Sequence, residues 1–143
     1  MGFNLPDVSK SISDPQVKQF LEKFYETSNH PENHGDFADL FTSDGVYAMN
    51  DKRAKGKDEI RALRKAIWSH VPARDHYPIK IYTHGTDQYD LMAHGEVKYN
   101  HHHGHATETE WACSCNLVKE GEELKVAYYQ IIVVRNNHNS GDS

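Results

Sequence analysis

The second half of the chain is an almost continuous series of strand-like segments, and this constrains the fold more than any other feature. After Pro72, four segments are rich in β-branched and aromatic residues and are separated by the turn signals GTD, HHHG and KEGEE. The four segments read YPIKIYTH, QYDLMAHGEVKYN, ATETEWACSCNLV and LKVAYYQIIVVR. Because the last three are long and consecutive, hairpins between neighbours are the most economical topology.

Helical patterns come before these strands. The stretch SDPQVKQFLEKFYETSN offers Ser13 or Asp14 as an N-cap and Pro15 in the first turn, followed by apolar residues three and four apart. The stretch KDEIRALRKAIWSHV has an apolar stripe with Lys and Arg expected on the other side. Between them, DFADLF is a short amphipathic piece, GVYAMN a brief strand and DKRAKG a turn. Helices in the first half of the sequence and strands in the second half indicate an α+β fold, with the helices on one face of a curved antiparallel sheet.

Size and charge limit the organisation and the partners. A chain of 143 residues is sized for one domain, predicted over residues 14–135, with a flexible arm at 1–13 and a disordered polar tail at 136–143. The net charge of −5, without a Lys/Arg cluster, argues against a nucleic-acid partner. Apolar runs such as QIIVV are too short to span a membrane, and no signal-peptide core opens the chain. We therefore expect a cytoplasmic protein whose cysteines, Cys113 and Cys115, are reduced.

Four histidines in five positions, His101–His103 and His105, are the most unusual local feature. Strand-like sequence flanks them on both sides, which places them in a hairpin connection and argues against a terminal tag. A structural zinc site needs four ligands around a closed centre, and no Cys or carboxylate is placed by spacing to complete one. We therefore predict no physiological metal site, and no cofactor.

The order of elements, with DLFTSDGVYAMN, GKDEIRAL, GEVKY, TEWACSCNLV and LKVAYYQ, resembles the SnoaL-like branch of the nuclear-transport-factor-2-like superfamily. The closest likeness is to small fungal SnoaL-like proteins, which share the Gly-x-Val-x-Tyr strand, here Gly95 to Tyr99, then Trp-Ala and Tyr-Gln. This resemblance implies a cone, or α+β barrel, formed by a bent sheet around helices. It also implies an apolar pocket in the cone's mouth and a homodimer through the outer sheet face.

The period of two along each strand predicts which residues face the pocket. In LKVAYYQIIV, Lys125 should point to solvent. The inward set is then Leu124, Val126, Tyr128, Gln130 and Ile132, and the outward set, expected at a homodimer contact, includes Ala127, Tyr129 and Ile131. In TETEWACSCNL the inward set is Thr109, Trp111, Cys113, Cys115 and Leu117. The predicted ligand pocket comprises Tyr25, Tyr47, Met49, Trp68, Trp111, Cys113, Tyr128 and Gln130.

Candidate catalytic groups are few. The resemblance places Met49 where ketosteroid isomerases carry their base Asp, and Cys113 where they carry the oxyanion-hole Asp. The inward sets contain no Asp, Glu or His at mid-strand. His84 is the candidate general base, and the pair His70 and His76 could also reach the mouth of the cone.

Three functions stay open from the sequence. The first is a pocket protein acting on a hydrophobic, polyketide- or terpenoid-like molecule as an isomerase, cyclase or dehydratase. The second is a binding module for such a molecule without chemistry, and the third is a dimeric interaction domain whose aromatic interior is core. A pocket filled by its own side chains would select the third.

Overall fold

The computed structural model describes residues 12–30, 32–69, 73–100, 104 and 106–134, which form three helices and six strands. The elements are α1 (Pro15–Ser28), α2 (His34–Ala38), β1 (Phe41–Met49), β2 (Lys52–Lys55), α3 (Lys57–Trp68), β3 (Ala73–His84), β4 (Asp87–Asn100), β5 (Ala106–Glu120) and β6 (Glu123–Val133). None of the described helices is long and apolar enough to cross a membrane.

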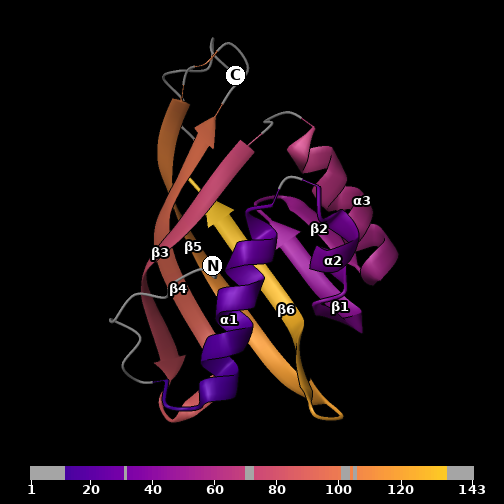
Figure 1. Ribbon diagram of the computed structural model, residues 1–143, viewed down its shortest axis with the longest axis vertical. Helices are drawn as coiled ribbons and strands as arrows, with labels where there is room; N and C mark the ends of the chain where they lie inside the picture. Colours follow the sequence, from indigo (N-terminus) through magenta and orange to yellow (C-terminus); the bar gives the residue numbers. More distant parts are fainter. Residues whose placement is uncertain (1–11, 31, 70–72, 101–103, 105, 135–143) are drawn as a thin grey trace.

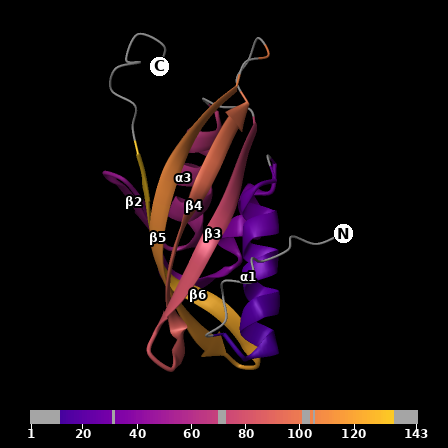
Figure 2. The same cartoon turned by 90° about the vertical axis from the view of Figure 1, so that its left-hand side faces the viewer.

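All six strands belong to one sheet in the order β2-β1-β6-β5-β4-β3. β3 to β6 form an antiparallel meander, as the four consecutive strand-like segments predicted, whereas β1 pairs parallel to β6 and makes the sheet mixed. The long strands bend, and α1 lies along one face of the sheet in both views (Figures 1 and 2). α2 and α3 lie beside β1 and β2 at the other side of the same face (Figure 1). The predicted α+β class is confirmed.

α1 shows why the sheet is covered on this face. Asp14 caps the helix by accepting a hydrogen bond from the Gln16 backbone N–H at 2.9 Å, and Pro15 occupies the first turn. The buried residues are Val17, Leu21, Phe24 and Tyr25. Burying a side chain of this kind stabilises a fold by roughly 1.5–3 kcal/mol, so this apolar stripe holds the helix on the sheet.

Two local predictions need correction. The segment DKRAKG was expected to be a turn, but Lys52–Lys55 form β2, which pairs with β1. The predicted arm is packed at its end, because Ile12 is 1% exposed and the Ser13 N–H donates to Gln88 Oε1 at 2.8 Å. Residues 1–11 and 135–143 lie outside the described part of the chain.

A β-bulge in β6 changes which side chains face the interior. Leu117 of β5 lies opposite Val126, but its neighbour Asn116 lies opposite Tyr128, so Ala127 is one extra residue in β6. Before the bulge, Leu124 and Val126 are buried as predicted. After it, the alternation is inverted and the buried residues are Tyr129, Ile131 and Val133.

The bulge overturns two predictions about this strand. Tyr128 and Gln130, predicted in the pocket, lie on the outer face, where the Tyr128 hydroxyl donates to Gln130 Oε1 at 3.0 Å. Tyr129 and Ile131, predicted at an outer dimer contact with Ala127, are 5% and 3% exposed on the inner face. The physical reason is that an extra residue shifts a period-two pattern by one position.

Ile132, predicted to face the pocket, is 55% exposed on the outer face because of the same bulge. The facing predicted for Trp111, Cys113, Cys115 and Leu117 of β5 is confirmed, because all four are buried. In β4, Leu91, Ala93 and Val97 are buried. These side chains and those of α1 form one hydrophobic core between helix and sheet.

Candidate functional site

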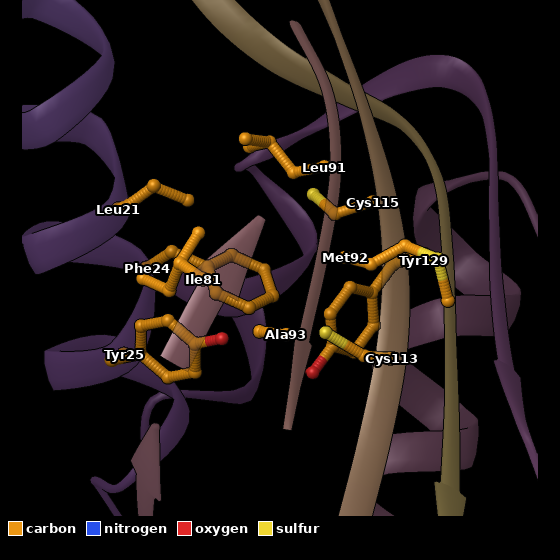
Figure 3. A pocket seen from close by; sticks show the side chains of 10 residues that line it. All are labelled: Leu21, Phe24, Tyr25, Ile81, Leu91, Met92, Ala93, Cys113, Cys115 and Tyr129. Atoms are coloured by element: carbon orange, nitrogen blue, oxygen red, sulfur yellow. The ribbon is translucent and has the colours of Figure 1, made fainter. Parts of the chain in front are cut away.

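A small apolar cavity lies between α1 and the middle of the sheet (Figure 3). Its volume is about 10 Å³, so it holds at most one water molecule and no ligand. Its lining residues are Leu21, Phe24, Tyr25, Ile81, Leu91, Met92, Ala93, Cys113, Cys115 and Tyr129. This part of the interior is filled by the protein's own side chains.

Three polar side chains beside this cavity are joined by hydrogen bonds. The hydroxyls of Tyr25 and Tyr129 face the Cys113 sulfur in Figure 3, and both hydrogen-bond to it. Burial raises the pKa of Cys113 to about 11, and it raises the pKa of Cys115 and of both tyrosines well above their ordinary values. All four groups are therefore neutral at pH 7, and a neutral buried thiol is a poor nucleophile.

A second cavity, which we call the mouth cavity, lies where α3 leads into β3 at one end of the sheet. Its volume is about 20 Å³, enough for about one water molecule. It is lined by Ser28, Phe37, Tyr47, Met49, Arg64, Trp68, Arg74, His76, Tyr129 and Ile131. The lining thus combines aromatic and aliphatic walls with two guanidinium groups and one imidazole, and no carboxylate belongs to it in the part of the chain that the structure describes.

Arg64 enters this cavity from α3 and is only 2% exposed. Its guanidinium donates to the backbone carbonyls of Thr27 and Ser28, both at 3.2 Å, and of His30 at 2.6 Å. These carbonyls lie at and just beyond the end of α1, the negative pole of the helix dipole. The guanidinium carbon also lies 5.0 Å from the ring centre of Trp68.

Arg74 enters from the start of β3 and is 4% exposed. Its guanidinium donates to the carbonyl of Ile67, near the end of α3, at 2.9 Å. Its guanidinium carbon lies 4.7 Å from the Trp68 ring centre and 5.5 Å from that of Tyr99. Two buried cations therefore share the Trp68 side chain as a neighbour.

Both guanidinium groups stay charged at neutral pH. Burial lowers the pKa of Arg64 to about 10, and it lowers that of Arg74 as well. None of the ion pairs between described residues involves either arginine. The Nε atoms of both are buried without a hydrogen-bond partner among those residues. Two positive charges thus lie in the interior with backbone carbonyls and aromatic faces as their compensation.

His76 is a further polar side chain of the lining besides the two arginines, and hydrogen bonds with Asn29 hold it in position. The Asn29 side-chain oxygen accepts from the His76 backbone N–H at 2.8 Å and lies 3.4 Å from Nδ1. Because the amide nitrogen of Asn29 donates to the His76 carbonyl at 3.3 Å, the orientation of this amide is defined, and Nδ1 carries the proton. Burial, and then the charges of Arg74 and Arg64, lower the pKa of His76 to about 3. The imidazole is therefore neutral at physiological pH.

Comparisons with known proteins support the fold. No protein-family model matches the sequence, and no curated protein matches it significantly. Among solved structures, a candidate scytalone dehydratase from Novosphingobium aromaticivorans has a TM-score of 0.71 at 10% identity, over 84% of this chain and 83% of that one. ActVI-ORFA from Streptomyces coelicolor has a TM-score of 0.68 at 15% identity, over 82% and 94%. Nuclear transport factor 2 from Cryptosporidium parvum has a TM-score of 0.70 at 12% identity, over 92% and 99%.

The chain has the fold of nuclear transport factor 2. This agrees, at the level of the fold, with the resemblance found in the sequence, and the closeness to small fungal members stays a prediction. The neighbours with this fold carry different names. A fold shared by proteins with different activities does not fix the function, which has to be argued from the site.

The structure separates the predicted pocket residues into three groups. Tyr47, Met49 and Trp68 line the mouth cavity, whereas Tyr25 and Cys113 line the smaller apolar one. Trp111 is buried between them, with its ring centre 6.1 Å from that of Tyr25 and 6.0 Å from that of His76. Tyr128 and Gln130 are on the outer face because of the bulge.

The predicted catalytic histidines also separate. His84 is not at the mouth, because its side chain is 82% exposed near the turn between β3 and β4, where Nδ1 lies 3.2 Å from Asp90. The prediction that it reaches the cavity is wrong. His76 does line the cavity, and His70 lies outside the described residues, as do His101–His103 and His105. Within the described ranges, no three His, Cys, Asp or Glu side chains gather closely enough to hold a metal ion.

The sequence reasoning did not find the two arginines. Arg64 lies four residues after Ile60 and four before Trp68, both buried, so the helical period itself places it on the inner face. Arg74 precedes the predicted start of its strand, but β3 begins at Ala73 and puts Arg74 in register with Tyr99. The position of Arg64 within the apolar stripe of the helix was the sequence signal that could have indicated its burial.

Proposed function

We propose that the protein binds a small hydrophobic molecule at the mouth cavity and that it does so without transforming it. The observation that supports this proposal is the composition of the lining. Tyr47, Met49, Trp68 and Ile131 supply apolar and aromatic walls, while the polar groups among the lining residues are donors and a neutral imidazole. Concave sites with such walls and a few convergent polar groups are typical of small-molecule binding.

Catalysis by a general base is disfavoured by the same lining. An effective base has a pKa near the working pH, and the pKa of His76 is about 3. The Tyr47 hydroxyl has its pKa raised by burial, so it is a hydrogen-bond donor and not a base at pH 7. An isomerase, cyclase or dehydratase activity would therefore need a group from outside the described lining. Binding without chemistry is the simpler function.

The small volume of the cavity favours the alternative of an interaction domain with a filled core. A bicyclic ligand cannot enter about 20 Å³ unless lining side chains move. Met49 is half-buried, and its unbranched side chain has three rotatable bonds. We therefore expect ligand entry to displace Met49.

Binding of a neutral apolar probe tests the proposal. We expect 2-naphthol to bind saturably, with one molecule per chain, in isothermal titration calorimetry. The variant Met49→Trp should weaken this binding at least tenfold, because the larger side chain fills the entry to the cavity. The control Val118→Trp places the same side chain at an exposed position of β5, away from the cavity lining, and should leave the affinity unchanged.

A titration without saturation would select the interaction-domain alternative. Equal affinities for the wild type and Met49→Trp would show that the probe binds elsewhere. Circular dichroism of both variants checks that the fold is retained.

We also propose that two copies pair through the outer sheet face. The support is three exposed apolar side chains on the sheet, Tyr82 on β3, Met92 on β4 and Ile132 on β6, which are 44%, 56% and 55% exposed. Tyr82 is in register with Met92, and Ala112 of β5, the strand between β4 and β6, lies opposite Ile132. Large apolar side chains on an exposed sheet face are typical of protein contact surfaces.

The variant Ile132→Glu is expected to be a monomer at concentrations where the wild type is a dimer. The charge would be buried without a partner in the contact, which weakens association by two or more orders of magnitude. Light scattering coupled to gel filtration measures the mass directly. The control Ala66→Glu adds the same charge to an exposed position of α3 and should leave the dimer intact, whereas a monomeric wild type would refute the pairing.

A further inference from the structure

The two buried guanidinium groups, of Arg64 and Arg74, are only partly satisfied by the described residues around them. Removing a charged group from water is unfavourable unless it is paired and hydrogen-bonded. Arg64 and Arg74 are 2% and 4% exposed, and each keeps a buried Nε–H without a partner among the described residues. Arg74 has one hydrogen bond from its guanidinium among them, to the Ile67 carbonyl.

A purely structural role explains part of this arrangement. Arg64 holds three carbonyls around the end of α1, and Arg74 holds one carbonyl of α3, so both act as helix C-terminal caps. This role does not require that both cations line the same cavity. It also leaves unexplained why both guanidinium carbons lie within 5.0 Å of the centre of one ring, that of Trp68, with no carboxylate paired to either among the described residues.

We infer that the mouth cavity binds the carboxylate group of an apolar acid, held between Arg64 and Arg74. This inference rests on the proposed function, since it names the class of molecule bound there. A carboxylate would supply the acceptors that the described lining lacks, because planar guanidinium groups match its two oxygens. The cavity of about 20 Å³ has room for about one water molecule, so the Met49 side chain has to move to admit the acid, whose apolar part can then lie against Trp68 and Ile131.

Of the other polar groups of the lining, the Tyr47 hydroxyl favours an anion, whereas the neutral His76 does not contribute to its binding. His76 carries its proton on Nδ1, which faces Asn29, and adds no positive charge of its own. The Tyr47 hydroxyl is a further donor in the same lining. Among the described residues, no acidic side chain lines the cavity to repel a carboxylate or to compete with it for the arginines.

Two probes of the same shape test the inference, 2-naphthoate and its neutral counterpart 2-naphthamide. Charge-assisted hydrogen bonds should make the wild type bind naphthoate roughly 10- to 100-fold more tightly than naphthamide, measured by isothermal titration calorimetry. In Arg74→Gln we expect this preference to fall below threefold. Arg74→Lys keeps the charge and should keep most of the preference.

A control variant separates local charge from the net charge of the protein. Arg61→Gln removes an exposed cation one turn before Arg64, where it pairs with Asp58, and should leave the preference unchanged. Equal affinities of the wild type for the two probes would overturn the inference and leave the proposed function standing. Failure of both probes and of 2-naphthol to bind would overturn both. Because the wild-type ratio alone decides the first case, the test does not depend on the folding of any variant.

Discussion

Replacing Tyr129 by alanine is expected to destabilise the protein by about 3–5 kcal/mol, whereas the same change at Tyr128 should cost less than about 1 kcal/mol. The Tyr129 ring lies 4.9 Å from that of Phe24 and 6.0 Å from that of Tyr47, and its hydroxyl bonds to Cys113. Tyr128 lies on the outer face, with Arg53 5.7 Å from its ring centre. Urea unfolding followed by circular dichroism measures both free energies.

These two variants are each other's control, because adjacent residues lose the same side chain. The difference between them reports the facing of β6 after the extra residue Ala127. Measurements at several protein concentrations separate any contribution of Tyr128 to pairing of two copies from its contribution to the fold. A larger loss of stability for Tyr128→Ala than for Tyr129→Ala would mean that β6 has no bulge and that the alternation predicted from the sequence is right.

Acidification below pH 6.5 is expected to destabilise the protein through His76. The pKa of this imidazole is about 3 in the folded protein, against an ordinary value of 6.5, because burial and the charges of Arg74 and Arg64 oppose protonation. Between these two values the unfolded chain binds a proton that the folded chain does not. The ratio of folded to unfolded protein should therefore fall as the pH is lowered, by up to about tenfold for each pH unit. This dependence on pH should reach its full steepness by pH 5 and persist towards pH 3.

The variant His76→Gln isolates this contribution from that of the many carboxylates. Its free energy of unfolding should depend on pH less steeply than that of the wild type, by about one proton between pH 5 and 4. The slope is the relevant quantity, since loss of the contact with Asn29 can lower stability at every pH. If the free energy of unfolding depends on pH equally steeply for the wild type and His76→Gln, His76 is not held neutral in the folded protein.

The strand and helix patterns predicted the fold because each depends on burial along a regular period. Leu91, Ala93 and Val97 lie on one side of their strand and His94 and Glu96 on the other, and only one register puts all three apolar residues inside. In β6 both alternations are mostly apolar, so the sequence allows either Tyr128 or Tyr129 to face inward. A bulge there has no signature in the residues themselves, and the pairing with β5 was needed to find it.

The candidate site was predicted in part for a different reason. Tyr47, Met49 and Trp68 were found because apolar residues at the right period are assumed to be inside, and they line the mouth cavity. Arg64 was assigned to the solvent face because charged residues are seldom buried. Its burial depends on carbonyls at the end of another helix, α1, and such tertiary contacts are not visible in a local pattern.

A crystal structure of the protein with 2-naphthoate would test most directly whether the mouth cavity is a binding site. We expect the carboxylate within hydrogen-bond distance of the guanidinium groups of Arg64 and Arg74, with the naphthalene ring against Trp68 and the Met49 side chain displaced. A mouth cavity that stays closed at a saturating concentration of naphthoate, or a ligand seated elsewhere on the molecule, would contradict the account.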